Sequence, residues 1–159
     1  MKYYNEKKNF LAIPGKGFYS YEASRFIIQQ APYERTSSYI SGSEKGPQAM
    51  VSASQFVELY DEELQQESYK NGGICTLHPI EFGKKKDAKA MNLIAESTKR
   101  ILDDKKFPVT LGAEHTITLG TVQAIKEKYP DVCVLQFDAH SDLRESYNGN
   151  PYSHASVMH

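Results

Sequence analysis

The stretch Val132-Cys133-Val134-Leu135-Gln136-Phe137-Asp138-Ala139-His140-Ser141-Asp142 gives the strongest indication of the fold. Its first part is an apolar run rich in β-branched side chains, which predicts a buried parallel strand over residues 132–137. Asp138, His140 and Asp142 then alternate directly after that strand. Because ligands of open α/β sheets bind outside the carboxyl ends of strands, we expect a binding site here rather than a solvated acidic loop. Two carboxylates and an imidazole favour Mn²⁺ or a similar divalent cation.

A second motif, Gly112-Ala113-Glu114-His115, follows another predicted strand over residues 107–111. Helical spacing begins at Thr116, and one face of this helix is expected to carry Thr118, Thr121, Val122, Ile125 and Tyr129. His115 is therefore predicted to lie at a strand-to-helix turn, again at the carboxyl end of a strand. A lone histidine at such a turn is more often structural than a metal ligand, but the later Asp-His-Asp cluster favours a metal role.

A third motif, Asn150-Pro151-Tyr152-Ser153-His154, closes a loop that begins at Asp142. This loop is rich in asparagine, glycine and proline, which favour turns. Polar loops at the carboxyl edge of a sheet often carry binding or catalytic residues. The three motifs together hold three of the five histidines in the chain, so we interpret them as parts of one site.

The composition of the chain limits the classes of function that the protein can have. The chain has 159 residues, 40% of them hydrophobic and 25% charged, as expected for a globular domain. A formal net charge of −1 gives no reason to expect nucleic acid or an anionic membrane as partner. Two widely spaced cysteines without a Cys-x-x-Cys motif fit a reducing cytosol, and Cys133 is expected to be buried and inert. With no apolar leader and no membrane-length stretch, we expect a cytoplasmic protein.

The remaining pattern alternates strands and helices. Residues 1–24 have no clear period and are interpreted as an arm that packs on a neighbour, and residues 25–29 as the first strand. Gly46-Pro47 opens a helix whose expected apolar face carries Ala49, Met50, Ala53 and Val57. Short strands are expected around residues 59–60 and 74–77. The clearest helix, residues 87–104, repeats apolar side chains at Met91, Ile94, Ala95, Thr98, Ile101 and Leu102. This alternation predicts a parallel sheet with helices on both faces.

The three motifs in combination resemble the signature motifs of the ureohydrolase family, which includes arginases, agmatinases, guanidinobutyrases and formimidoylglutamases. The resemblance is strongest to bacterial-type agmatinases. The segments that carry it are Leu111–Thr118, Phe137–Arg144 and Tyr152–Ala155, with weaker similarity in Ala31–Glu34, Gly46–Ala49 and Leu59–Leu64. It implies a three-layer α/β/α parallel sheet of the arginase-like type, truncated before the C-terminal strands. Residues 25–159 would then be the N-terminal part of a single ureohydrolase-like α/β domain, preceded by the arm.

The resemblance also implies roles for individual residues. His115 and Asp142 would bind one Mn²⁺ and His140 a second, with Asp138 bridging both. His154 would relay a proton to the leaving amine, while Asn150 and Tyr152 would shape the substrate pocket. Arginases carry asparagine at the position of Arg144, where it helps to hold the substrate's α-carboxylate. The arginine here favours a substrate without that group, most simply agmatine, which would give putrescine and urea. The family resemblance further implies a homo-oligomer, a trimer or a hexamer.

Two departures from the family pattern qualify this expectation. Ala113 replaces the second glycine of the usual motif, and the last family motif, Asp-x-Asp followed by Asp-Pro, is absent. Two divalent ions bring four positive charges, against two negative charges from Asp138 and Asp142. We therefore expect weak binding of the second metal and no activity from this chain alone.

Three alternatives stay open: a non-catalytic fragment or regulatory subunit of the same fold, another ureohydrolase (arginase, guanidinobutyrase or formimidoylglutamase), and a related single-zinc deacylase.

Overall fold

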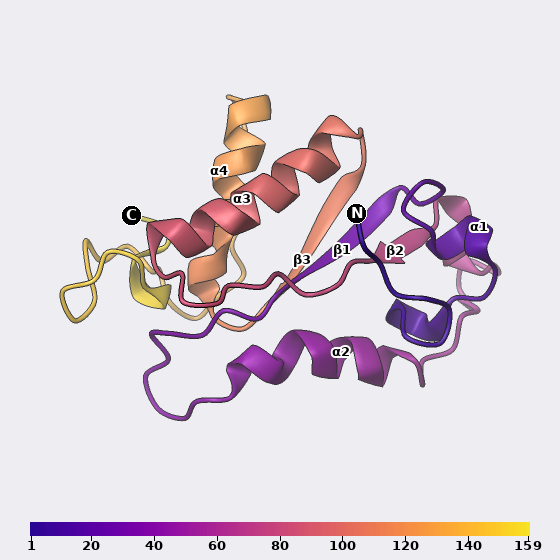
Figure 1. The fold of residues 1–159 in the computed structure, drawn as a ribbon, viewed down its shortest axis with the longest axis horizontal. Helices are drawn as coiled ribbons and strands as arrows, with labels where there is room; N and C mark the ends of the chain where they lie inside the picture. The colour runs from indigo at the N-terminus through magenta and orange to yellow at the C-terminus, as the bar shows by residue number, and fades with distance from the viewer.

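A three-stranded parallel sheet organises the chain (Figure 1). The computed structural model describes all 159 residues. The central strand β1 (Phe26–Ala31) pairs with β2 (Ile74–Thr76) on one side and with β3 (Phe107–Gly112) on the other. In the register of β1 and β3, Ala31 lies opposite Gly112 at the carboxyl end. The loops that follow these two strands therefore leave the sheet side by side.

Helices cover both faces of the sheet, as predicted. Figure 1 shows α2 (Gly46–Ser54) on one face, with α3 (Ala88–Asp103) and α4 (Thr118–Lys128) on the other. The shorter helices are α1 (Lys16–Tyr19), η1 (Phe10–Ala12), η2 (Ser43–Lys45), η3 (Ser68–Asn71), η4 (His115–Ile117) and η5 (His154–Ser156). The result is a three-layer α/β/α arrangement. None of the helices is both long and apolar enough to cross a membrane.

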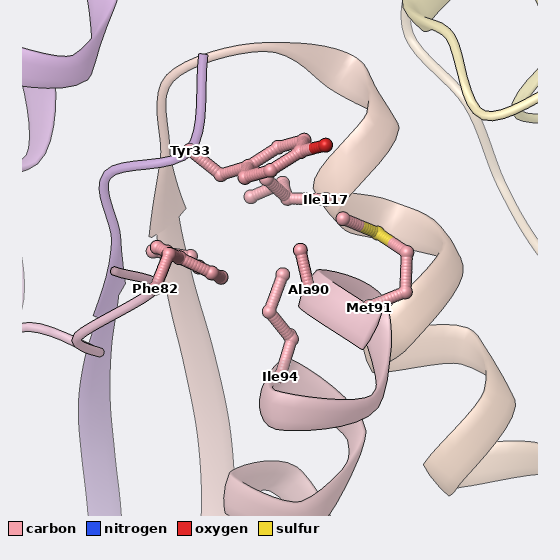
Figure 2. Packing of buried hydrophobic residues seen from close by; sticks show 7 residues of the cluster. Tyr33, Phe82, Ala90, Met91, Ile94 and Ile117 are labelled. Atoms are coloured by element: carbon pink, nitrogen blue, oxygen red, sulfur yellow. The ribbon is translucent and has the colours of Figure 1, made fainter. Parts of the chain in front are cut away.

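The face of α3 was predicted correctly except at Ala95, which is half-buried. Met91, Ile94, Thr98, Ile101 and Leu102 are all buried. Figure 2 shows Ala90, Met91 and Ile94 of this helix in one cluster with Tyr33, Phe82 and Ile117. The helix is long enough for its three- and four-residue spacing to define one apolar stripe, which is why the sequence identified it.

The predicted face of α2 was wrong, and the predicted face of α4, although mostly half-buried, missed the two buried positions of that helix. In α2 the buried residues are Pro47, Val51 and Ser54, while Met50 is exposed. Ser54 can lie inside because its hydroxyl donates to the carbonyl oxygen of Val51 and accepts from the backbone N–H of Leu11. In α4 the buried positions are Gly120 and Ala124, which are small enough to let α4 approach α3 closely.

The predicted strand over residues 132–137 is also wrong. This segment forms no strand, and all its residues except the half-buried Gln136 are exposed, with Leu135 at 80% and Phe137 at 92%. Cys133, expected to be buried, is exposed as well. A strand that is apolar on both faces needs a hydrogen-bonded neighbour and a covering layer on each face. In the structure no strand pairs with residues 132–137 and no layer covers them. Around residues 59–60 no strand forms either, only an isolated bridge between Asp61 and Gln66.

Residues 1–24 fold against their own chain. Tyr3 forms an antiparallel bridge with Leu77, and the side chains of Asn9, Ile13 and Tyr21 are buried. The Asn9 side chain closes this segment on itself, since it accepts from the backbone N–H of Ile13 and donates to the carbonyl of the same residue. The division of the chain after residue 24, and any contact of this segment with a neighbour, stay predictions.

Gly120 provides a test of the α3–α4 packing. A Cβ atom at this position would lie 2.5 Å from the carbonyl oxygen of Met91 and 2.8 Å from Cβ of Ile94. We expect Gly120→Ala to lower the free energy of unfolding by about 1–3 kcal/mol, because the helices must separate. Urea denaturation measures this change. Gly17→Ala is the matched control, since no atom lies within 4 Å of its added Cβ. Equal stability of both variants would contradict the close helix contact.

Candidate functional site

The first part of the site is the turn between β3 and η4. Gly112 ends the strand, and a Cβ atom there would lie 1.9 Å from Cδ1 of Ile117, so only glycine fits beside that side chain. The chain then turns through Glu114 into His115, the first residue of η4. His115 is therefore held at the carboxyl edge of the sheet, as the sequence predicted.

His115 lies against two aspartates from the later motif. Its Nδ1 is 2.6 Å from Oδ2 of Asp142 and 3.4 Å from Oδ2 of Asp138. One ligand atom from each of these three residues lies within 4.8 Å of the others. The Asp142 side chain is only 8% exposed, and its backbone has a φ of +50°. One imidazole and two carboxylates at this spacing can hold a divalent cation.

His140 lies at the margin of this cluster. Its side chain is 81% exposed, and its Nδ1 is 3.2 Å from Oδ1 of Asp138. Its backbone N–H donates to the same oxygen at 2.8 Å. This hydrogen bond favours the charged carboxylate and holds the pKa of Asp138 below its ordinary value. Asp138 thus faces His115 through one oxygen and His140 through the other, which is the arrangement a bridging ligand needs.

His154 contacts a different set of residues. Its Nδ1 lies 2.9 Å from the hydroxyl oxygen of Thr36, and its Nε2 lies 3.2 Å from that of Ser38. The ring of Tyr147 packs edge-on against the imidazole, with centroids 5.1 Å apart. None of these contacts is to the three clustered ligands, so His154 is held separately from them.

His154 and two of the three clustered residues, His115 and Asp142, open into the same cavity. It measures about 850 Å³ and is lined by Ser37, Ser38, Glu114, His115, His140, Ser141, Asp142, Leu143, Arg144, Tyr147, His154 and Ala155. The guanidinium of Arg144 lies over the ring of Tyr147, 5.8 Å from its centroid. A cavity lined by a cluster that could hold a cation and by a separate imidazole can support hydrolysis, because both an activated water and a proton carrier could face one substrate.

Asn150 and Tyr152 lie outside this lining. The Asn150 side chain donates to Oδ1 of Asp87 and accepts from the backbone N–H of Tyr152. Asn150 borders a neighbouring cavity of about 340 Å³, while the Tyr152 ring packs against the core cluster of Figure 2. Their assignment to substrate binding stays a prediction.

Comparison with known proteins agrees with this geometry. The family model described as Arginase family matches residues 24–159. The chain belongs to the arginase family. It is 37% identical over 143 residues to an agmatinase of Bacillus cereus, covering 87% of this chain and 48% of that protein. It is 35% identical over 162 residues to an N(1)-aminopropylagmatine ureohydrolase of Synechocystis, covering 99% and 52%.

Solved structures of the arginase family share the fold. The agmatine ureohydrolase of Thermoplasma volcanium superimposes with a TM-score of 0.77 at 30% identity, over 95% of this chain and 48% of that one. The chain spans about half the length of the curated relatives that it matches. The predicted resemblance to agmatinases and the predicted α/β arginase-type fold are confirmed.

One part of this arginase-family site was missed by the sequence analysis. Thr36 and Ser38 belong to the loop after β1, and both contact His154. Glu114 fixes this loop by accepting the backbone N–H groups of Arg35 and Thr36. Isolated serines and threonines in a polar loop carry no spacing signal. The only available indication was that the loop follows a strand whose carboxyl end lies at the predicted edge.

Proposed function

We propose that this chain is the metal-binding part of a dimanganese hydrolase that cleaves a guanidino substrate, most simply agmatine, to putrescine and urea. The observation that carries the proposal is the cluster of His115, Asp138 and Asp142, of which His115 and Asp142 line the same cavity as His154. Agmatinases and an aminopropylagmatine ureohydrolase are among its relatives, and both names describe enzymes that act on guanidino compounds. The reaction breaks the bond between the guanidinium carbon and the chain nitrogen.

The donor atoms fit a hard or borderline divalent cation. His115, Asp138 and Asp142 would hold one ion, and His140 together with the second oxygen of Asp138 would hold another. When bound, such a pair of ions lowers the pKa of water and orients it toward an electrophile. The Asp142 carboxylate supports this role because it is nearly buried and has only His115 and Gln136 as side-chain partners. A buried carboxylate with few partners favours a cation beside it.

His154 would act as the proton carrier. Water adds its oxygen to the guanidinium carbon, and the departing amine must gain a proton as the carbon–nitrogen bond breaks. Histidine is suited to this transfer near neutral pH. The side chain borders the cavity but belongs to no group of metal donors, which supports proton transfer rather than metal binding.

The alternative functions left open by the sequence differ in the number of metal ions or in the substrate. A single-zinc deacylase would use one ion, so its metal site would not need the Asp138–His140 contact. Other guanidino substrates, as in arginase, guanidinobutyrase or formimidoylglutamase, would keep the same metal donors and differ in what the cavity binds. The proposed homo-oligomer and the cytoplasmic location follow from the family resemblance and the composition and stay predictions.

Asp138→Ala tests the metal site. We expect the variant to lose most of its bound manganese, because Asp138 faces both His115 and His140. Elemental analysis of the desalted protein after incubation with Mn²⁺ measures the loss. Asp131→Ala is the control, since Asp131 is exposed and lies outside the cluster. Unchanged manganese content in Asp138→Ala would rule out the bridging role.

His154→Ala tests the proton carrier. We expect it to keep its manganese and to lose roughly 10²–10⁴-fold in turnover when the chain is combined with a polypeptide covering the other half of its relatives. His78→Ala is the control, because this histidine stacks on Tyr4 away from the cavity. A metal-free His154→Ala protein would show that the residue is a ligand instead.

The isolated 159-residue chain is expected to have no measurable ureohydrolase activity. Two carboxylates cannot balance two divalent ions, and His140 is largely exposed, so the second ion is held by too few protein donors. The assay is urea release from agmatine with excess Mn²⁺, first with the chain alone and then with the complementary polypeptide. Turnover that appears only in the mixture supports the proposal. Turnover by the chain alone would overturn this expectation, and its absence in both would favour the non-catalytic fragment.

A further inference from the structure

The hydroxyl of Thr36 joins Glu114 to His154. Its oxygen lies 3.2 Å from Oε1 of Glu114 and 2.9 Å from Nδ1 of His154. The backbone N–H of His154 also donates to this oxygen, at 3.1 Å. Thr36 therefore has three partners, of which one is a carboxylate, one is an N–H donor and one is a ring nitrogen whose proton is unassigned.

Glu114 acts in this network as an acceptor. Its Oε2 receives the backbone N–H groups of Arg35 and Thr36 at 3.1 and 2.7 Å, and its Oε1 receives the hydroxyl of Thr116 at 2.9 Å. Three donors thus converge on the carboxylate from residues other than the Thr36 hydroxyl. Thr36 can donate only one side-chain proton, that of its hydroxyl, to Oε1 of Glu114.

Counting donors then assigns the proton on His154. A hydroxyl has one proton and two lone pairs. If Thr36 gives its proton to Glu114, one lone pair accepts the backbone N–H of His154 and the other must accept a proton from Nδ1. If Thr36 gave its proton to Nδ1 instead, the oxygens of Thr36 and Glu114 would face each other 3.2 Å apart without a hydrogen between them. The first arrangement satisfies every group.

We propose that Glu114 and Thr36 are positioning residues that hold neutral His154 in the tautomer with the proton on Nδ1. Nε2 is then the nitrogen that accepts and releases a proton. It contacts only the hydroxyl of Ser38, an exposed residue that lines the cavity and is itself within 3.4 Å of the Tyr147 hydroxyl. A substrate amine can displace such an exposed hydroxyl more easily than the ordered Thr36. The catalytic consequence rests on the proposed function, but the tautomer does not.

The tautomer is measured directly on the full 159-residue chain. Two-bond ¹H–¹⁵N correlation spectra of ¹⁵N-histidine-labelled protein, recorded at a pH where the imidazole is neutral, distinguish a protonated ring nitrogen from an unprotonated one. His154→Gln identifies the signals. We expect a protonated Nδ1 and an unprotonated Nε2 in the native chain. A native spectrum with the proton mainly on Nε2 would overturn the proposal, whatever the outcome of the activity assays.

Two variants test the two positioning residues. Thr36→Val removes the hydroxyl at nearly constant volume, and we expect it to abolish the preference for Nδ1–H, with Thr36→Ser restoring it. Glu114→Gln places an amide donor opposite Thr36, so the Thr36 proton must turn to Nδ1 and the dominant tautomer should invert. This second variant keeps the test decisive if Thr36→Val fails to fold. A native-like tautomer in folded Thr36→Val or Glu114→Gln would overturn the proposal.

Ser38→Ala is the matched control. Ser38 contacts His154 from the same loop, but at Nε2 rather than at Nδ1. We expect this variant to keep the Nδ1–H tautomer, because the Thr36 and Glu114 contacts remain. Loss of the tautomer in Ser38→Ala would show that Ser38 rather than Thr36 sets it, and would overturn the assignment to Glu114 and Thr36.

Discussion

Parallel pairing of β1 with β3 is the constraint on which the site depends. Because Ala31 is opposite Gly112, the chain leaves both strands at the same level of the sheet edge. The loop after β1 and the turn after β3 must then meet, and both carry backbone N–H groups that the sheet no longer pairs. Glu114 satisfies two of them, at Arg35 and Thr36. The register of the two strands thereby fixes the position of the loop residues that contact His154.

The sequence was informative where a pattern is long or chemically specific. The stripe of α3 and the position of His115 at a strand-to-helix turn could be predicted, because each depends on local spacing. The buried positions of α2 and α4 could not be predicted, because they depend on contacts outside the helix's own apolar pattern. Ser54 can be buried because its hydroxyl is hydrogen-bonded, and Gly120 is buried because it has no side chain to clash with α3. Thr36 lies 118 residues from His154 and carried no pattern of its own. The strand predicted over residues 132–137 does not form, because an apolar segment becomes a β-strand only where neighbouring strands pair with it.

The proposed metal donor Asp142 and the proposed proton carrier His154 are linked through one loop. The backbone N–H of Arg144 donates to the carbonyl of Ala155, and that of Met158 donates to the carbonyl of Asp142. These bonds tie the two ends of the loop together, so His154 cannot move far relative to Asp142. Asp142 itself adopts a left-handed backbone, which among residues other than glycine is taken up mainly by asparagine and aspartate. Glycine would suit that backbone better but would remove the carboxylate.

The exposed run over residues 132–137 has a consequence for the behaviour of the chain in solution. It combines β-branched and aromatic side chains with no charge and no proline, and the sheet has an unpaired edge at β3. Such segments and edges are templates for strand addition between molecules, and they are the usual starting points of aggregation. The nearest charges that could oppose stacking are Asp131 and Asp138 at its two ends. Asp138, which lies beside both His115 and His140, therefore also places a negative charge at one end of this run.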